Sequence, residues 1–462
     1  MANLNSSIKI VEVTTVTPPQ DSKTPNSLPL TFFDLVWLRS PPTKRLYLYE
    51  LPTVSTATFF DSVLPKLKHS LSLTLRHFLP LAGNISWPET SPKPLIDYVG
   101  GSDDGVSFTV AESDADFYDL SAADINESTA SHLLVPDLAV SKEKAAVTAL
   151  QITVFPNRGF SIGITTHHAV LDGKSSTSFI KAWSHICKIG DQYSTASLPE
   201  LNLLYDRSVI KDPKGLEAIY VNNCLQSGGP NNKSLLPDHK PRIPSDTVRV
   251  TFQLSRVKIE KLREFVKVEM AKRKDQNPHH VSTFSLTVAY TCTCLAKSEG
   301  LSSEIELVLI SFGVDCRSRL EPPVLGYFGN CMTLKVAFAE AKGVMGKEGF
   351  LVAVNAISEA IKSLETDGIF HGAENRVAGK HSLPPFKLYN FSGSPRFEVY
   401  NSDFGWGRPT KVDMPCFDTN SAISLSDSKN GDGGVQIGLP LNKHIVEAFA
   451  SQFAKGLEDL PF

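Results

Sequence analysis

The chain changes its pattern of hydrophobicity at the stretch Thr165-Thr166-His167-His168-Ala169-Val170-Leu171-Asp172-Gly173. Before it, residues 159–165 alternate small or polar with apolar side chains, which is typical of a half-buried strand. After it, residues 174–190 carry apolar side chains at helical spacing behind a polar start. The sequence therefore predicts a strand, a sharp turn that bears two histidines, and a helix.

The turn has the side chains that proton transfer needs. An imidazole at the end of a strand suits a general base, because its ordinary pKa lies near neutrality. His168 is followed four residues later by the carboxylate of Asp172, and Gly173 then lets the chain bend. Taken alone, however, such a histidine is more often structural than catalytic, so the rest of the chain has to decide its role.

Length, charge and cysteine content define the class of protein. With 462 residues, two domains are expected, because a single hydrophobic core stops growing near ~250–300 residues. The net charge is −3 and both signs are mixed along the chain, so we predict neither nucleic acid nor a membrane as a partner. The seven cysteines are scattered and odd in number. This pattern favours a reducing compartment, and we predict a cytoplasmic protein.

Both halves of the chain mix strand and helix patterns, which predicts two α/β domains. A polar, irregular stretch near the middle separates them. We predict an N-terminal domain at 1–190, a linker at 191–224 and a C-terminal domain at 225–462. Within the last of these, a segment around 403–427 can pack on the first domain.

Several further segments have clear local patterns. Residues 28–38 have the pattern of a buried entry segment, and the nearly continuous apolar run at 305–314 predicts a buried central strand. Ser255 and Asn442 each precede a helical pattern and are predicted N-caps.

The signatures of several other enzyme classes are absent from the sequence. The one match to Gly-x-Ser-x-Gly, Gly159-Phe160-Ser161-Ile162-Gly163, lies inside the predicted strand and not on a strand-to-helix turn, so a serine hydrolase of the α/β type would lack its nucleophile elbow. The sequence contains no phosphate-binding Gly-x-x-x-x-Gly-Lys-Ser/Thr loop. His167 and His168 lack a His-Glu-x-x-His frame, and Cys292 and Cys294 have no partner pair at zinc spacing. We therefore predict no metal site.

Two motifs together point to a family. His168-x-x-x-Asp172-Gly173 in mid-chain and Asp403-Phe404-Gly405-Trp406-Gly407 near the end resemble the BAHD family of plant acyl-CoA-dependent acyltransferases, in order and in separation. Tyr327-Phe328-Gly329-Asn330-Cys331 is similar to the signature of the anthocyanin and flavonoid-glucoside branch, many of whose members are malonyltransferases. With Leu79-Pro80-Leu81-Ala82-Gly83 and Tyr205-Asp206-Arg207-Ser208, the resemblance extends over essentially the whole chain.

The resemblance implies a fold and a reaction. The fold would be α/β, with two similar-sized domains like chloramphenicol acetyltransferase, mixed sheets flanked by helices, and an active-site channel between the domains. His168 would be the general base that takes the proton from an acceptor hydroxyl. The hydroxyl oxygen would then attack the thioester directly, without an acyl-enzyme. A monomer would transfer malonyl from malonyl-CoA, a co-substrate and not a permanently bound cofactor, to a sugar hydroxyl of an anthocyanin, flavonoid or other phenolic glucoside.

The resemblance also assigns supporting roles. Asp172 is expected to point away from His168 and to pair with Arg317, or with Arg319 as second choice, so that it fixes the loop. The motif Asp403-Phe404-Gly405-Trp406-Gly407 is expected to be structural and packed near the channel for CoA.

Residues that contact the substrates have weaker signals. Ser392, Ser394 or backbone amides beside them could donate to the oxyanion, although serines in loops more often cap turns. Ser255, Lys258 and Lys261 lie where the family binds CoA phosphates, although an exposed basic face explains them equally well.

The sequence leaves the donor and the acceptor open. A coumaroyl-CoA donor for the same acceptors is the alternative, because the branch contains both kinds of enzyme. Lys174 could attract a malonyl carboxylate, but a solvated lysine at the start of a helix is the favoured interpretation. A more distant alternative is a relative that binds CoA without catalysis.

Overall fold

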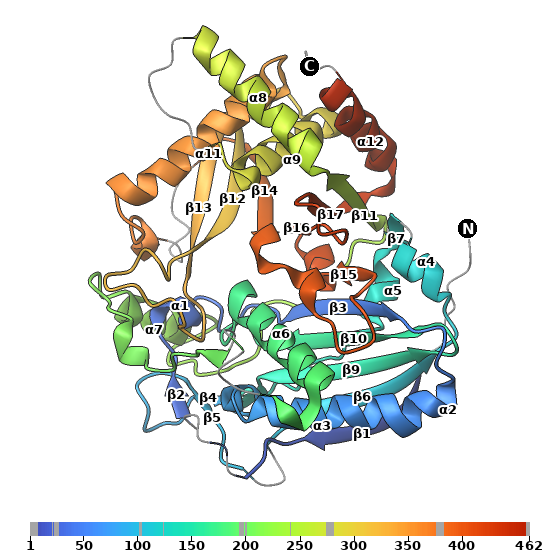
Figure 1. The fold of residues 1–462 in the computed structure, drawn as a ribbon. Helices are drawn as coiled ribbons and strands as arrows, with labels where there is room; N and C mark the ends of the chain where they lie inside the picture. Colours follow the sequence, from blue (N-terminus) through green and yellow to red (C-terminus); the bar gives the residue numbers. More distant parts are fainter. Residues whose placement is uncertain are drawn as a thin grey trace. The chain divides into compact units, whose positions relative to one another are not determined.

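The computed structural model describes residues 8–20, 22, 27–100, 104–122, 124–193, 198, 201–240, 242–273, 281–375 and 383–458 (Figure 1). Its contacts divide the chain into two compact units. The first comprises Met1–Arg242, Arg317–Met332 and Val399–Cys416, and the second comprises Ile243–Cys316, Thr333–Glu398 and Phe417–Phe462.

The units differ in extent from the predicted domains 1–190 and 225–462. The predicted linker, 191–224, belongs to the first unit, and two segments from later in the chain join it. One of these adds a strand to the first sheet, because Val412 pairs with Tyr47. Of the late segment around 403–427, the part up to Cys416 belongs to the first unit and the part from Phe417 onward to the second.

A mixed six-stranded sheet forms the centre of the first unit. Its strands lie in the order β1 (Ile8–Val16), β6 (Val106–Ser113), β9 (Thr148–Phe155), β10 (Gly159–Thr166), β3 (Thr43–Glu50) and β15 (Lys411–Asp413). Only β6 and β9 pair in parallel; the other neighbours are antiparallel.

The central strand β10 is more deeply buried than its sequence predicts. Alternation in 159–165 predicts a half-buried strand, but every residue of β10 is buried. On one face, a Cβ at Gly163 would meet the carbonyl oxygen of Leu134 at 2.1 Å, and Thr165 donates to the carbonyl of Pro136 at 2.5 Å. Small and hydroxyl side chains therefore serve here for close backbone approach, and not for exposure to water.

Helices cover the other face of this sheet. The helices α3 (Leu64–Leu75) and α6 (Gly173–Ile189) pack on each other, and Trp183 of α6 donates to the carbonyl of Leu67 at 3.3 Å. A smaller sheet has the order β2 (Ser27–Pro29), β5 (Leu95–Asp97), β4 (Asn84–Ser86) and β8 (Lys144–Ala146). Further elements of this unit are α1 (Phe32–Leu35), α2 (Thr56–Thr58), α4 (Phe117–Ala122), β7 (Ile125–Glu127), α5 (Ser128–His132) and α7 (Leu216–Gln226).

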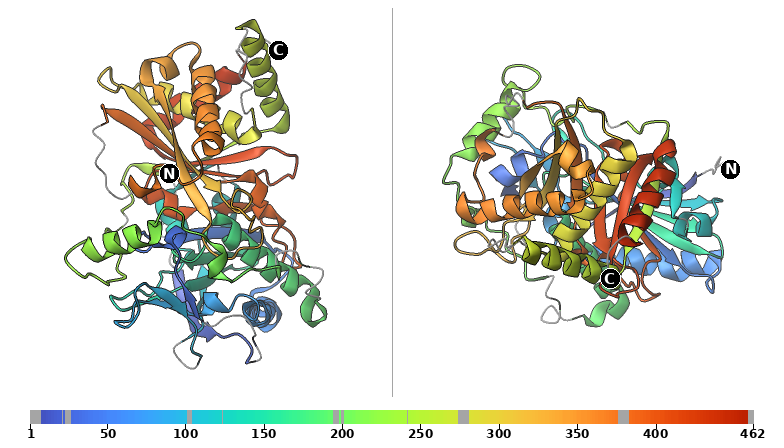
Figure 2. Two further views of the ribbon diagram at one scale, coloured as in Figure 1. Left: turned by 90° about the vertical axis from the view of Figure 1, so that its left-hand side faces the viewer. Right: turned by 90° about the horizontal axis from the view of Figure 1, so that it is seen from above.

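The second unit has its own mixed sheet and core. Its strands lie in the order β13 (Met332–Glu340), β12 (Leu307–Asp315), β14 (Phe386–Gly393), β16 (Ile423–Asp427), β17 (Val435–Asn442) and β11 (Thr247–Leu254). The helix α9 (Thr283–Glu299) packs against α8 (Arg256–Lys272), α11 (Gly349–Thr366) and α12 (Lys443–Glu458), which Figure 2 shows near it. It also contacts the short helix α10 (Ala341–Met345). The α/β prediction, with mixed sheets and helices in both halves, is confirmed.

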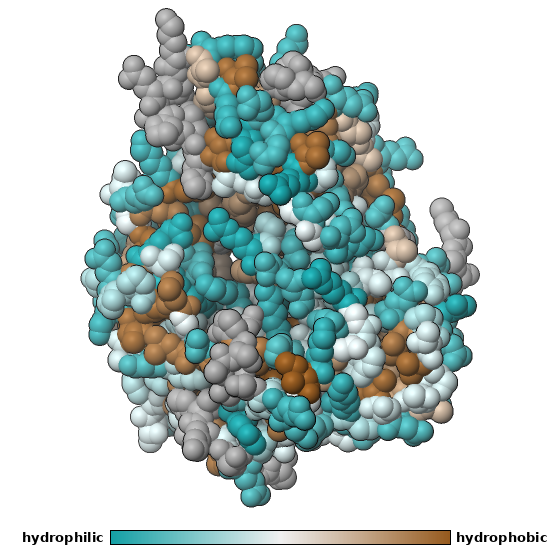
Figure 3. Space-filling model, viewed as in Figure 1, coloured by the Kyte–Doolittle hydropathy of each residue, from teal (hydrophilic) through white to brown (hydrophobic). Residues whose placement is uncertain are grey.

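Two local predictions in this unit are confirmed. The run 305–314 forms the central strand β12, and the Ser255 hydroxyl caps α8 by accepting from the amide of Lys258 at 3.4 Å. In the part of the chain that the structure describes, no helix is long and apolar enough to cross a membrane. On the face shown in Figure 3, hydrophilic and hydrophobic residues are interspersed.

Candidate active site

The histidine pair lies on the predicted turn between a strand and a helix. β10 ends at Thr166 and α6 begins at Gly173. His167 is buried, and its amide donates to the carbonyl of Val147 at 2.9 Å. His168 is only partly buried, so it is the histidine of the pair that a substrate can reach.

The ring of His168 is held in place by an aromatic neighbour. The ring of Trp37 stacks on it, with 3.9 Å between ring centroids and 3° between ring planes. Nδ1 of His168 is enclosed by protein, whereas the residue as a whole keeps some exposure. The accessible edge of the ring therefore lies away from Nδ1, which leaves Nε2 as the nitrogen for proton transfer.

Burial sets the protonation state of the histidines. It lowers the pKa of His168 from its ordinary value to about 4, against smaller raising effects of its own carbonyl and of Asp172. It also lowers the pKa of His167 to about 4, with a contribution from His168. His168 is consequently neutral at pH 7, and a neutral imidazole has the lone pair that a general base needs.

We expect the pH profile of kcat/KM to show this lowered pKa. The value should stay level as the pH falls from neutrality to about 5 and decline only on approach to about 4, because His168 is a base only above its pKa. Circular dichroism at each pH would establish that the protein is still folded. A profile that has already fallen by half near pH 6.5 would contradict the buried environment of this ring.

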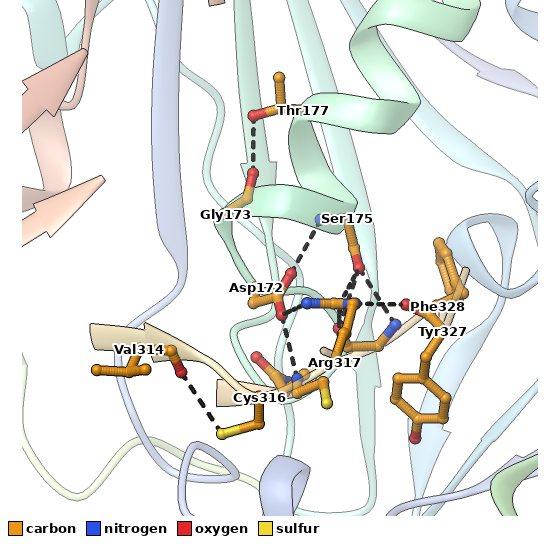
Figure 4. Close-up of polar contacts among 12 residues, drawn as sticks. Asp172, Gly173, Ser175, Thr177, Val314, Cys316, Arg317, Tyr327 and Phe328 are labelled. Carbon is orange, nitrogen blue, oxygen red and sulfur yellow. Dashed lines mark hydrogen bonds and ion pairs between the residues drawn. The ribbon is translucent and has the colours of Figure 1, made fainter. Parts of the chain in front are cut away.

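The carboxylate of Asp172 is directed at its own loop and at Arg317 (Figure 4). One oxygen caps α6 by accepting from the amide of Ser175 at 2.9 Å, and the other lies 2.8 Å from Nη1 of Arg317. The amide of Cys331 donates to that same oxygen at 3.1 Å. Both charged residues are nearly fully buried, whereas Arg319, the second choice as partner, is exposed. The expected ion pair is thus present.

The guanidinium of Arg317 is also fixed on its other sides. Its Nε donates to the carbonyl of Tyr327 at 2.9 Å, and its Nη2 donates to Ser175 Oγ and to the carbonyl of Gly329, both at 2.9 Å (Figure 4). The segment that carries the Tyr327-Phe328-Gly329-Asn330-Cys331 signature is therefore joined to the start of α6 through one arginine. A buried charge with so many partners is held rigidly.

A second network, which the sequence did not reveal, supports His168 from the backbone side. The side-chain amide of Asn330 donates to the carbonyl of His168 at 2.9 Å and to Oδ1 of Asp34 at 3.0 Å. The other oxygen of Asp34 accepts from the amide and the hydroxyl of Thr31, at 2.9 and 2.8 Å. Residues 28–38 are thus more than a buried entry segment. The spacing Thr31-x-x-Asp34, typical of a capping box, was the one available signal.

Trp37 is a second contact of His168 that the sequence did not reveal. Replacing it by leucine should lower kcat by ~10–100-fold, because a catalytic group displaced by about 1 Å loses rate on that scale. Trp37→Phe should retain most of the turnover, since a phenyl ring can still stack on His168. Steady-state kinetics of both variants, with their melting temperatures, would test this. A phenylalanine variant as slow as the leucine variant, at equal stability, would contradict a stacking role.

Hydrogen bonds and aromatic packing hold the motif Asp403-Phe404-Gly405-Trp406-Gly407 in place. One oxygen of Asp403 accepts from the amides of Gly405 and Gly407, at 2.8 and 2.9 Å, and the other from Lys188 at 2.7 Å. Both glycines have positive φ, +105° and +106°, a conformation that L side chains rarely adopt. Phe404 is buried, with its ring edge-on to Trp183 at 4.9 Å.

The residues predicted to contact the oxyanion and CoA belong to the second unit, whereas His168 belongs to the first. Ser394 caps a short turn by accepting from the amide of Arg396 at 3.2 Å, which is the structural role left open for it. Ser392 lies on β14 and is partly buried. Lys258 and Lys261 are exposed on the helix that Ser255 caps.

Comparisons with known proteins are consistent with this geometry. A profile of the Transferase family matches residues 6–455. A malonyl-CoA:anthocyanidin 5-O-glucoside-6''-O-malonyltransferase of Arabidopsis thaliana is 40% identical, over 99% of this chain and 100% of its own. Phenolic glucoside malonyltransferase 1 of the same plant is 41% identical, over 99% of both.

Among solved structures, vinorine synthase matches with a TM-score of 0.70 at 22% identity, over 97% of this chain and 98% of its own. At that identity the likeness concerns the fold. The fold expected from the two motifs, α/β with two chloramphenicol acetyltransferase-like domains, is thereby confirmed.

Proposed function

The chain belongs to the BAHD family of acyl-CoA-dependent acyltransferases, and we propose that it transfers malonyl from malonyl-CoA to a sugar hydroxyl of an anthocyanin, flavonoid or other phenolic glucoside. One observation carries the chemistry: a neutral, partly exposed His168 on a loop that the Asp172–Arg317 pair fixes. The names of relatives about 40% identical over their whole length support the malonyl donor and the glucoside acceptor.

His168 would act as the general base. Its Nε2 accepts the proton of the acceptor hydroxyl while the hydroxyl oxygen attacks the carbonyl carbon of the thioester. The tetrahedral oxyanion collapses and the carbon–sulfur bond breaks. The imidazolium then gives the proton to the leaving CoA sulfur. The products are the malonyl ester and free CoA. A positioned base typically contributes ~10²–10⁴ in rate, which is what a weakly nucleophilic sugar hydroxyl requires.

The substrate contacts of the second unit stay part of the proposal. Of the two serines considered for the oxyanion, Ser392 is the better donor, because the hydroxyl of Ser394 already caps a turn. Ser255, Lys258 and Lys261 would bind the phosphates of CoA, with the two exposed ammonium groups as the charged contacts. The protein would work as a cytoplasmic monomer without a permanently bound cofactor. The free state of its seven cysteines is compatible with a reducing compartment.

A donor assay tests the function directly. The purified protein is given one phenolic glucoside together with malonyl-CoA, acetyl-CoA or coumaroyl-CoA, and products are followed by mass spectrometry and by release of free thiol. We expect the malonyl ester as the main product. A coumaroyl ester with no malonyl ester would show that the donor is coumaroyl-CoA, and acyl transfer would still be the reaction. CoA binding without turnover of any donor would identify a non-catalytic relative instead.

A further inference from the structure

Arg45, on β3, is a buried arginine with neutral partners. Only 7% of the residue is exposed. Its Nη1 donates to Thr177 Oγ1 at 2.9 Å and to the hydroxyl of Tyr47 at 3.3 Å, and its Nε lies 3.2 Å from the sulfur of Met414. Among the residues that the structure describes, no carboxylate lies within ion-pair distance of it, and its Nη2 has no hydrogen bond.

The other buried arginines show how unusual this is. Arg317 pairs with Asp172, and Arg249 pairs with Asp418. Arg39 donates to three backbone carbonyls and lies 4.0 Å from Asp238. A guanidinium withdrawn from water without a counter-ion is costly, so a group of this kind calls for an anion that the protein alone does not supply.

The neighbouring strand has no spare negative charge for Arg45. On β15, Asp413 pairs with Leu46, the residue that follows Arg45 on β3. Its carboxylate, however, lies 3.7 Å from the ammonium group of Lys411, and both of these side chains are buried. The local acid is therefore already matched with a cation.

Arg45 lies close to the catalytic loop. On the adjacent strand β10 it is opposite Ile164, four residues before His168. Its partner Thr177 is on α6 and also donates to the carbonyl of Gly173 at 2.7 Å (Figure 4). With a rise of ~1.5 Å per residue, Thr177 lies only ~7 Å along the helix from Asp172. The guanidinium of Arg45 thus contacts the helix that follows the catalytic loop, from the strand beside the one that precedes it.

We propose that Arg45 binds the free carboxylate of the malonyl donor and thereby selects malonyl-CoA over uncharged acyl thioesters. The inference rests on the proposed function, in which malonyl is the transferred group. A planar guanidinium binds a carboxylate through two parallel hydrogen bonds, and Nη2 is available for this contact. The carboxylate supplies the missing counter-charge, while Thr177 and Tyr47 hold the guanidinium in position.

The test compares donors in matched variants. Arg45→Met keeps a long, flexible side chain but removes the positive charge. Arg45→Lys keeps the charge but cannot make two parallel hydrogen bonds to one carboxylate. Lys174→Met is the control, since it removes the other cation considered for the malonyl carboxylate. For each, kcat/KM is measured with malonyl-CoA and with acetyl-CoA on the same acceptor, together with the melting temperature.

Arg45→Met should lower the malonyl-to-acetyl ratio of kcat/KM by ~10–100-fold, the scale of one charged hydrogen-bonded contact. Acetyl transfer and the melting temperature should change little, because the free enzyme loses an unneutralised charge. Arg45→Lys should recover part of the ratio, and Lys174→Met should leave it unchanged.

Other outcomes separate the two proposals. If the parent enzyme prefers malonyl-CoA and Arg45→Met keeps that preference, or loses both donors equally, the role of Arg45 is overturned and the proposed function stands. Loss of the preference in Lys174→Met alone would assign the carboxylate to Lys174. A parent enzyme that does not use malonyl-CoA overturns both.

Discussion

His168→Ala should abolish nearly all transfer while leaving the protein folded. The variant loses the group that takes the proton from the acceptor hydroxyl, and we expect kcat to fall by ~10²–10⁴. Its side chain makes a ring contact with Trp37, while its carbonyl keeps the hydrogen bond from Asn330 after the substitution. Product formation, circular dichroism and binding of CoA by calorimetry would together show a folded protein that binds and does not react.

His167→Asn is the matched control for that experiment. His167 is the neighbouring histidine, it is buried, and its Nδ1 accepts from the amide of Ala169 at 3.2 Å. An asparagine can also accept from this amide, so the variant should lose stability more than activity. Should His168→Ala instead retain turnover close to that of the parent, the general-base assignment would be wrong.

Asp172→Asn should damage stability and activity together. It leaves the buried guanidinium of Arg317 without its carboxylate, and removing one partner of such a pair typically destabilises by ~3–5 kcal/mol. Asparagine can still cap α6, which places the expected change at the lower end of that range. The loop that carries His168 would loosen, and kcat should fall by ~10–100-fold. Chemical denaturation and steady-state kinetics would measure the two effects.

A double-mutant cycle sharpens this prediction. With Arg317→Met added to Asp172→Asn, the buried charge disappears, so the double variant should be less destabilised than the sum of the two single variants. If Asp172→Asn kept full stability and lost only the proton transfer by His168, Asp172 and His168 would form a catalytic dyad. The geometry favours the first outcome, because Asp172 bonds with Ser175, Arg317 and Cys331.

Several features were within reach of the sequence alone. The strand, turn and helix around His168 follow from a change of period in the hydrophobic pattern. The cap that Ser255 forms on α8 depends on residues three positions apart. The positive φ of Gly405 and Gly407 likewise depends on the residue type at each position. All of these interactions are local, so their signal is contained in a few neighbouring residues.

Other features needed the tertiary structure. Asp34 and Asn330 are 296 residues apart and meet only because the chain brings a late segment into the first unit. Trp37 is one more apolar residue of a segment predicted to be buried, and nothing in the sequence around Arg45 sets that residue apart. Whether an arginine is neutralised depends on which side chains surround it. For Arg45 one of those neighbours, Met414, lies 369 residues away.

The sequence by itself therefore determined the family, the mixed α/β architecture, the histidine that we propose as the base, and the cap that Ser255 forms. The tertiary structure alone decided how that histidine is held and which nearby guanidinium lacks a counter-ion. Period and capping act over one or two turns of chain, whereas burial and charge compensation depend on distances in space between residues from remote parts of the sequence.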